Sequence, residues 1–351
     1  MLNEVELLKQ LVAIPSVSRD EEAAVSFLVG QMRALGLEAH VDEAGNAVGA
    51  RSRPDEQGRV THDIVLLGHI DTVPGNIPVA IEDGRLYGRG TVDAKGPLAA
   101  FTVAAARAQL PPGVRVIVVG AVEEEAATSR GARHVARVFR PDLCIIGEPS
   151  GWDSVTLGYK GRLLVDFTLR RPMAHSAGPE RGPAVEAIAW YNRLMAFIDQ
   201  YNGRHSRLFD QILPSIREMA THSDGLANRA ALKLGLRLPP HFDVDGLTRE
   251  MQRWAPDATI RCHGCEPAFQ DKRSSPLARA FQRALLREGK RARFTLKTGT
   301  SDMNVVGPIW NCSIVAYGPG DSTLDHTAAE HFELPEYRRA IVVLQGVLEQ
   351  L

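Results

Sequence analysis

The sequence predicts an α/β domain, built on a mainly parallel sheet flanked by helices, that is interrupted by a smaller α+β domain. Apolar runs alternate with helical segments up to about residue 150, which is typical of a buried parallel sheet. Near residue 160 the strands begin to alternate apolar and polar residues. After Pro276 the earlier pattern of apolar runs and helical segments resumes. A length of 351 residues suits about two domains. We therefore expect a split larger domain, residues 1–160 and 275–351, and an inserted domain, residues 161–274.

Two helices are predicted within the first thirty-five residues. Each follows a pair of residues that can form a capping box, Asn3 with Glu6 and Ser18 with Glu21. Apolar residues recur at helical spacing from Val25 to Leu35, and Gly36 ends the second helix. Turn residues at Gly45-Asn46 and Asp83-Gly84 then indicate short strands.

The larger domain is predicted to contain strands that are buried on both faces. Their near-continuous Val, Ile and Leu content supports this, and the runs are Ile64–Gly68, Val114–Val122 and Leu143–Gly147. Helices are expected between them, from Pro97 and around Gly131–Phe139. The C-terminal part adds a helix that ends near Gly289, strands near Phe294 and at Ser313–Tyr317, and a last helix from Pro335.

The inserted domain begins with a strand that has one polar face. Between Gly161 and Arg170 every second residue is apolar. The expected elements that follow are a helix (Pro183–Tyr201), a strand (Leu232–Leu238), a helix (Val244–Trp254) and a strand (Ala258–Cys262). This order resembles a βαββαβ module, so the inserted domain is expected to be ferredoxin-like.

Composition excludes several classes of function. Forty-one basic and 42 acidic residues leave a formal charge of −1, which gives no support to a nucleic-acid or anionic-membrane partner. No run approaches the ~20 apolar residues of a membrane span, and the first residues, Met1 to Glu6, lack the features of a signal peptide. Four cysteines are too few for a disulfide framework. A cytoplasmic protein is expected.

Cys262-His-Gly-Cys265 has the spacing of a redox or zinc motif. No second Cys/His pair completes a structural zinc site, and Glu266 stands where a haem-attachment motif needs histidine. A redox or metal role for Cys262 and Cys265 is therefore the minor interpretation.

The first candidate for chemistry is the pair His69 and Asp71, directly after the strand Ile64–Leu67. Residues two apart in a strand point to the same side, and ligands of parallel sheets gather at the carboxyl ends of the strands. A metal-binding imidazole oriented by a carboxylate would have this pattern. A histidine and an aspartate that only hydrogen-bond a turn remain the alternative.

Glu123-Glu124-Glu125 and Glu148 follow other predicted strands and are further candidate metal donors. His326 follows the glycine-rich turn Gly318–Gly320, and Asp93 follows another glycine-containing segment. That segment matches neither the dinucleotide fingerprint nor the Walker pattern. The three adjacent glutamates could form the acidic first turn of a solvated helix, but if buried they need a cation or a retained proton. The donors favour zinc or a similar ion and exceed what one tetrahedral zinc needs, which suits two metals sharing a carboxylate.

The ordered motifs resemble the dizinc aminoacylase/carboxypeptidase family, which includes acetylornithine deacetylase and succinyl-diaminopimelate desuccinylase, over essentially the whole chain. The resemblance implies an amide hydrolase with two Zn²⁺, for which Co²⁺ can substitute. It implies that His69 and Glu148 bind one metal, that Glu125 and His326 bind the other, and that Asp93 bridges them. Glu124 would be the general base, and Asp71 would orient His69.

The resemblance also implies a homodimer, formed through the inserted domain, that completes the active site. Ala174-His175-Ser176 matches the family histidine that reaches the partner subunit's active site and stabilises the oxyanion; an ordinary surface histidine is the alternative. Positions that would contact substrate are Asn228, Arg237, Thr300 and Ser301, the last two in the segment Thr298–Asp302. Two residues depart from the family pattern, Glu123 for the usual Asp and Ala329 for the usual Asn, and neither removes a ligand.

Within the family, three segments are most similar to the lysine-biosynthesis hydrolases of the α-aminoadipate route: Gly120–Glu125, Gly158–Gly161 and Lys297–Met303. Those enzymes release lysine, and in some organisms ornithine, from an amino-group carrier protein, which implies a carrier-linked γ-glutamyl substrate here. The alternatives are acetylornithine deacetylase, succinyl-diaminopimelate desuccinylase or a small exopeptidase. A catalytically silent binding protein is the rival from another class.

Overall fold

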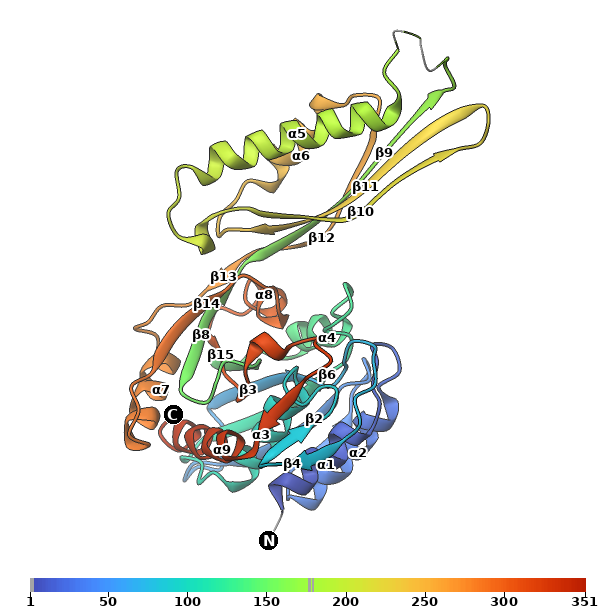
Figure 1. The fold of residues 1–351 in the computed structure, drawn as a ribbon. Coiled ribbons are helices and arrows are strands. Elements are labelled where there is room, and N and C mark those ends of the chain that lie inside the picture. Colours follow the sequence, from blue (N-terminus) through green and yellow to red (C-terminus); the bar gives the residue numbers. More distant parts are fainter. Residues whose placement is uncertain (1–2, 176–177, 179) are drawn as a thin grey trace. The chain divides into compact units, whose positions relative to one another are not determined.

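The fold was analysed in a computed structural model that describes residues 3–175, 178 and 180–351 (Figure 1). The chain divides into two compact units. The larger unit comprises the chain up to Gly158, Gln270–Leu296 and Ser301–Leu351. The smaller unit comprises Tyr159–Phe269 and Lys297–Thr300, so a short segment of the C-terminal third groups with the insertion.

A mixed sheet forms the centre of the larger unit. Within the described residues it has nine strands in the order β1-β2-β6-β3-β7-β15-β8-β13, with β14 paired to β8. Only the four central strands, from β6 to β15, are mutually parallel, whereas β1, β2 and β8 run antiparallel to their neighbours. The bounds are β1 (Glu38–Val41), β2 (Ala47–Arg53), β3 (His62–His69), β6 (Val114–Ala121), β7 (Leu143–Gly147), β8 (Ser154–Tyr159), β13 (Phe269–Gln270), β14 (Arg293–Lys297) and β15 (Ser313–Ala316). The predicted α/β class is confirmed, and the parallel pairing is confined to the centre.

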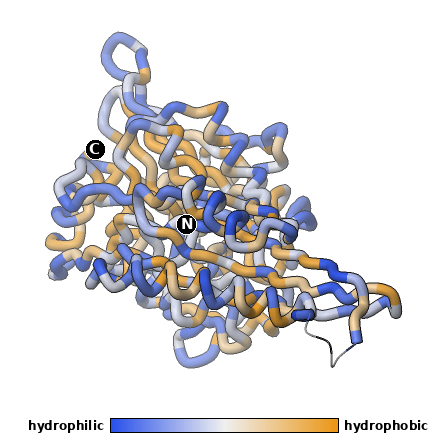
Figure 2. The backbone as a smooth tube through the Cα atoms, turned by 90° about the horizontal axis from the view of Figure 1, so that it is seen from above, coloured by the Kyte–Doolittle hydropathy of each residue, from blue (hydrophilic) through white to orange (hydrophobic). Residues whose placement is uncertain are grey.

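Helices cover this sheet and bury its apolar strands. They are α1 (Glu4–Ala13), α2 (Glu22–Ala34), α3 (Lys95–Arg107), α4 (Arg130–Val138), α7 (Pro276–Arg287), α8 (Asp302–Val306) and α9 (Leu334–Leu348), with a 3₁₀ turn η2 (Ser322–Leu324). The middle of β3 and β6 is fully buried, which explains why these strands lack a polar alternation. In Figure 2 hydrophobic stretches run through the inner part of the tube, and hydrophilic residues are frequent at its periphery. Each fully buried Val, Ile or Leu contributes about 1.5–3 kcal/mol to folding.

A second, three-stranded antiparallel sheet has the order β16-β5-β4, with β4 (Ala80–Glu82), β5 (Arg85–Tyr87) and β16 (His331–Glu333). The predicted turn at Asp83-Gly84 joins β4 to β5, and both residues have positive φ angles of 48° and 78°, as a tight hairpin requires. Because β16 pairs with β5, the segment that follows His326 lies beside the segment that precedes Asp93.

The smaller unit is a βαββαβ module, the type that the sequence predicts, although the sequence located only three of its four strands. Its elements are β9 (Gly161–Pro172), α5 (Pro183–Asn202), a 3₁₀ turn η1 (Leu208–Asp210), β10 (Leu213–Ser223), β11 (Ala227–Leu238), α6 (Val244–Trp254) and β12 (Thr259–Glu266). The sheet order is β10-β11-β9-β12, all antiparallel. One face packs on α5 and α6 and forms a separate apolar core that includes Phe167, Trp190 and Leu234.

The sequence did not reveal β10. Nearly all of its side chains are exposed, so it carries no apolar alternation that would mark a buried face. It is an edge strand, and within the described parts of the chain no other strand pairs with its outer edge.

The two predicted capping boxes have different outcomes. Asn3 caps α1 through its side-chain oxygen, as expected. The prediction at Ser18 and Glu21 is wrong, because no side-chain hydrogen bond caps α2. Ser18 donates to Asp71 instead (2.7 Å), and Glu21 accepts from the backbone N–H of Glu123 (3.1 Å). Both side chains therefore form hydrogen bonds with residues distant in the sequence and do not cap the helix.

None of the helices in the described residues is long and apolar enough to cross a bilayer.

Candidate metal centre

His69 ends β3 and is almost completely buried. Its Nδ1 lies 3.1 Å from the backbone oxygen of Asp71 and 3.5 Å from the Asp71 carboxylate. A carbonyl oxygen can only accept, so Nδ1 carries the proton and donates it, which leaves the lone pair of Nε2 in a neutral imidazole for a metal ion. Nε2 points toward Asp93 (3.1 Å) and Glu148 (3.9 Å). Asp71 therefore fixes the orientation of a potential ligand.

Two groups of donors form around a common carboxylate. His69, Asp93 and Glu148 make one group, and Asp93, Glu125 and His326 make the other, with the donor atoms of each group within 4.8 Å of one another. His326 Nε2 lies 2.8 Å from Glu125 and 3.0 Å from the second oxygen of Asp93. The structure thus brings all five predicted donors together and places Asp93 in both groups.

Buried side chains hold the acidic turn that follows β6. Four successive backbone N–H groups, from Val122 to Glu125, donate to Asn46, to Glu21 and to both oxygens of Asp71, at 3.0–3.1 Å. All three acceptors are buried. The backbone position of Glu124 and Glu125 is therefore set by segments far away in the sequence.

The three adjacent glutamates have different partners. Glu123 turns away from the donors and bonds Thr128 (2.5 Å) and Arg130 (2.9 Å). Burial raises the pKa of Glu124 well above its ordinary value, and the carboxylates of Glu148, Asp302 and Glu125 raise it further against the opposing effect of His69. A carboxyl group with a raised pKa can exchange a proton near neutral pH.

The donor set fits divalent cations. Burial lowers the pKa of His69, but its hydrogen bonds to Asp71 and Asp93 outweigh that and leave the pKa raised. Hydrogen bonds to Asp93 and Glu125 raise the pKa of His326 to about 10. The carboxylates therefore attract positive charge strongly, and a metal ion would meet that demand with neutral imidazoles. Imidazole and carboxylate donors without thiolate are typical of catalytic zinc and related ions.

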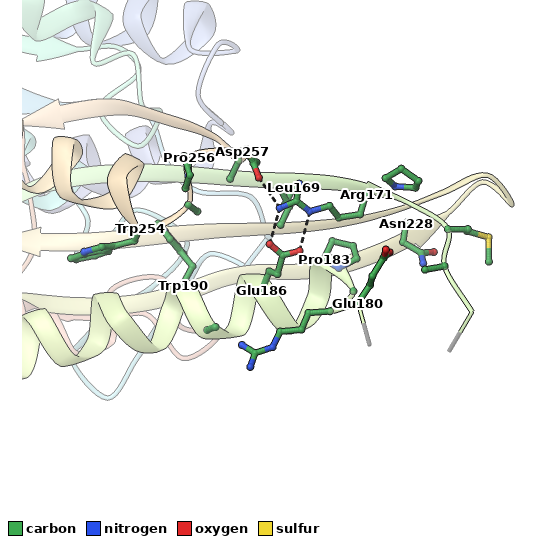
Figure 3. A pocket seen from close by; sticks show the side chains of 18 of the residues that line it. Leu169, Arg171, Glu180, Pro183, Glu186, Trp190, Asn228, Trp254, Pro256 and Asp257 are labelled. Carbon is green, nitrogen blue, oxygen red and sulfur yellow. Dashed lines mark hydrogen bonds and ion pairs between the residues drawn. The ribbon is translucent and has the colours of Figure 1, made fainter. Parts of the chain in front are cut away.

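The predicted substrate residues of the smaller unit lie in two places. Exposed His175 and half-buried Asn228 line a cavity of about 820 Å³ beside α5. In this cavity the guanidinium of Arg171 bonds Glu186 and Asp257 (Figure 3). Arg237 bonds the hydroxyl of Thr300. Arg237 lies nine positions after Asn228 along β11, which corresponds to about 30 Å at ~3.4 Å per residue.

Two further residues of the predicted substrate motifs, Ser301 and Ser176, lie outside the described part of the smaller unit. Ser301, in the larger unit, accepts from the backbone N–H of Met303 and caps α8. Ser176, the last residue of the Ala174-His175-Ser176 motif, lies outside the described residues.

The Cys262/Cys265 motif forms no metal site in the described parts of the chain. All four cysteines are free, and the clusters of metal-ligating side chains found there contain no cysteine. Burial raises the pKa of both thiols, which disfavours the reactive thiolate.

Five supporting residues were not identified from the sequence: Ser18, Glu21, Asn46, Arg89 and Glu330. Ser18 and Glu21 were assigned to a helix cap, and the others stand in turns with no period that could mark them. The feature that identifies such supporting residues is the burial of a polar or charged side chain beside a predicted ligand. Burial can be seen only once the fold is known.

Two groups of histidine and carboxylate donors, three of which lie at or after the ends of strands of the central sheet, with a glutamate of raised pKa beside them, are typical of a metal-dependent hydrolase. A profile of the peptidase family M20/M25/M40 matches residues 65–350, and the chain belongs to this family. It is a metal-dependent amide hydrolase.

Individual relatives match over nearly the full length. A protein of Deinococcus radiodurans named LysW-lysine hydrolase is 41% identical over 99% of this chain and 96% of its own length. One of Thermococcus kodakarensis, named putative LysW-lysine/LysW-ornithine hydrolase, is also 41% identical, over 99% of this chain and 92% of its own. Among solved structures, an M20 metallo-carboxypeptidase from Sulfolobus solfataricus superposes with a TM-score of 0.79 at 19% identity, covering 99% of both chains, and supports the fold.

Proposed function

We propose that this chain is a dizinc hydrolase that releases lysine, ornithine or both from the γ-glutamyl group of an amino-group carrier protein, LysW. The observation that carries the proposal is the shared position of Asp93 between two donor groups, with Glu124 beside them. The choice of substrate is supported by the names of the two relatives, each 41% identical over almost the whole chain.

In this proposal His69 and Glu148 hold one cation, Glu125 and His326 hold the other, and Asp93 contacts both. Bound cations lower the pKa of the attacking water and polarise the scissile carbonyl. Zinc suits these nitrogen and oxygen donors, and cobalt is the expected substitute.

Glu124 is the proposed general base. Its carboxylate takes the proton of the attacking water and returns it to the leaving amine of lysine or ornithine. The raised pKa supports both halves of this transfer, because a strongly acidic carboxyl would not hold the proton between the two events. Asp71 keeps Nε2 of His69 directed at the donors by occupying Nδ1.

A comparison of substrates tests the proposal. We expect kcat/KM for γ-glutamyl-lysine or γ-glutamyl-ornithine on LysW to exceed that for acetylornithine, acetyl-lysine and succinyl-diaminopimelate by about 100-fold or more, because ~3 kcal/mol of contacts would be lost with the carrier. Release of the free amino acid is the measured quantity. Exclusive hydrolysis of acetylornithine or succinyl-diaminopimelate would contradict the substrate assignment.

A homodimer formed through the smaller unit is also proposed. The outer edge of β10 and the exposed apolar side chains of Ile216 and Met219 support it, since such edges are normally covered. Asn228 and Arg237 are about 30 Å apart along one strand, so both cannot line one small-molecule site within a single chain. Two chains that contribute opposite ends of β11 would resolve this separation.

Mixing inactive variants tests whether His175 acts in the partner subunit. His175→Ala and Glu124→Gln are each expected to lose activity by about 10²-fold or more. When the two variants are refolded together or co-expressed, about half of the dimers are heterodimers, and each heterodimer contains one intact site of two. About a quarter of wild-type activity should therefore return in a two-fold symmetric dimer. If His175 acts within its own chain, or has no catalytic role, the mixture will show no more than the average of the two variants.

A cytoplasmic location is the last part of the proposal. Four free cysteines support it, because thiols stay reduced in that compartment.

A further inference from the structure

Glu330 is a buried carboxylate that belongs to neither donor group. It is 1% exposed. One of its oxygens accepts from the backbone N–H of Val92 (2.9 Å) and of Asp93 (3.2 Å), and the other accepts from the guanidinium of Arg89 (2.7 Å). Arg89 also donates to the carbonyl of Gly75 (3.2 Å). Both oxygens of the carboxylate are therefore engaged in hydrogen bonds.

The two ends of this contact belong to different metal-ligand segments. Glu330 stands four residues after His326, and it grips the backbone at Asp93. Asp93 in turn sends one oxygen toward His69 and the other toward His326. A displacement of the Asp93 backbone would change both distances at once, and it would do so without removing any ligand.

Folding stability alone is a weak explanation for such a pair. Burying an ion pair costs desolvation energy that often equals the attraction gained, so apolar residues of similar volume would stabilise the fold as well. Apolar residues could not, however, accept from two adjacent backbone N–H groups. The specific contribution of Glu330 is to fix the position of those two groups.

We propose that Glu330, held in place by Arg89, is a positioning residue that sets the location of Asp93 and thereby the spacing of the two cations; the inference rests on the dizinc function proposed above. Supporting carboxylates of this kind typically change metal affinity by about 10- to 100-fold when they are altered.

Glu330→Gln tests the inference, because the amide oxygen can still accept from the backbone while the amide nitrogen is forced to face the guanidinium of Arg89. Calorimetric titration with Co²⁺ should show weaker uptake by about 10-fold or more at one or both sites. The visible absorption of the cobalt-loaded protein should change as well. In turnover, kcat should fall while KM changes little.

The matched control is Glu333→Gln. Glu333 lies three residues away and forms an ion pair with Arg85 (2.6 Å), but both side chains are more than 40% exposed. Removing that pair should leave cobalt affinity, absorption and kcat unchanged, since exposed pairs contribute little.

A second variant separates positioning from general loss of structure. The double variant Glu330→Gln/Arg89→Met lacks the guanidinium that would face the amide nitrogen of Gln. Its cobalt affinity should therefore recover part of the loss, independently of any change in thermal stability.

Cobalt affinity, absorption and kcat of Glu330→Gln all within twofold of wild type would overturn the positioning role. If the wild-type chain binds two Co²⁺ and hydrolyses a carrier conjugate in the same experiment, that outcome leaves the proposed function intact. A wild-type chain that takes up no Co²⁺ or Zn²⁺ would overturn the proposed function and this inference with it.

Discussion

Glu124→Gln should abolish hydrolysis while leaving the metal content of the protein unchanged. The amide cannot accept the proton of the attacking water, so kcat should fall by about 10³-fold. Neither donor group includes Glu124. The amount of metal per chain should therefore equal that of wild type when it is measured by mass spectrometry after dialysis.

Glu123→Gln is the matched control for this experiment. It makes the same chemical change one residue earlier, on a carboxylate that bonds Thr128 and Arg130. The kcat of Glu123→Gln should stay within about tenfold of the wild-type value, because the substitution changes only hydrogen bonds that stabilise the turn. A Glu124→Gln enzyme with near-normal turnover, or one that has lost its metal, would show that Glu124 is not the base.

Asp93→Ala should have the largest effect on metal binding. Asp93 belongs to both donor groups. In the proposed dizinc site both cations would lose a ligand, so metal per chain should drop from two to one or none. Activity should fall by at least about 10³-fold, because the loss of metal removes several kcal/mol of transition-state stabilisation. Added Zn²⁺ raises the melting temperature of a protein that binds it in the folded state, and this rise should vanish in Asp93→Ala.

His326→Ala distinguishes a shared ligand from an ordinary one. It removes a donor from one group only and leaves His69, Asp93 and Glu148 intact. One metal per chain should remain. Equal stoichiometry in Asp93→Ala and wild type would contradict the bridging role.

The candidate donors at strand ends could be predicted from the sequence because the strands that precede them are chemically distinct. The middle of β3 and β6 reads as an uninterrupted apolar run, and β7 does so over its whole length, so the polar residues that follow each run mark its carboxyl end. Since parallel strands bring these ends to one edge, His69, the acidic turn and Glu148 were expected to meet.

The supporting residues could not be predicted, for a different physical reason. Ser18 and Glu21 have the sequence of a helix cap, and a local pattern cannot show that partners more than fifty residues away compete for both side chains. Strand β10 was missed because an edge with exposed faces has no hydrophobic period. In the proposed homodimer the substrate positions would come from two chains, and no spacing within one chain determines such an arrangement.

An inventory of ligands would suggest that the first sixty residues are dispensable, since every proposed donor lies at or beyond His69 and the family profile itself begins at residue 65. The hydrogen bonds contradict this. Glu21 and Asn46 hold the backbone N–H groups at the start of the turn that carries Glu124. A shortened chain would keep each metal-binding side chain and lose the framework that aims the base, so the smallest catalytic length of this enzyme extends well upstream of its ligands.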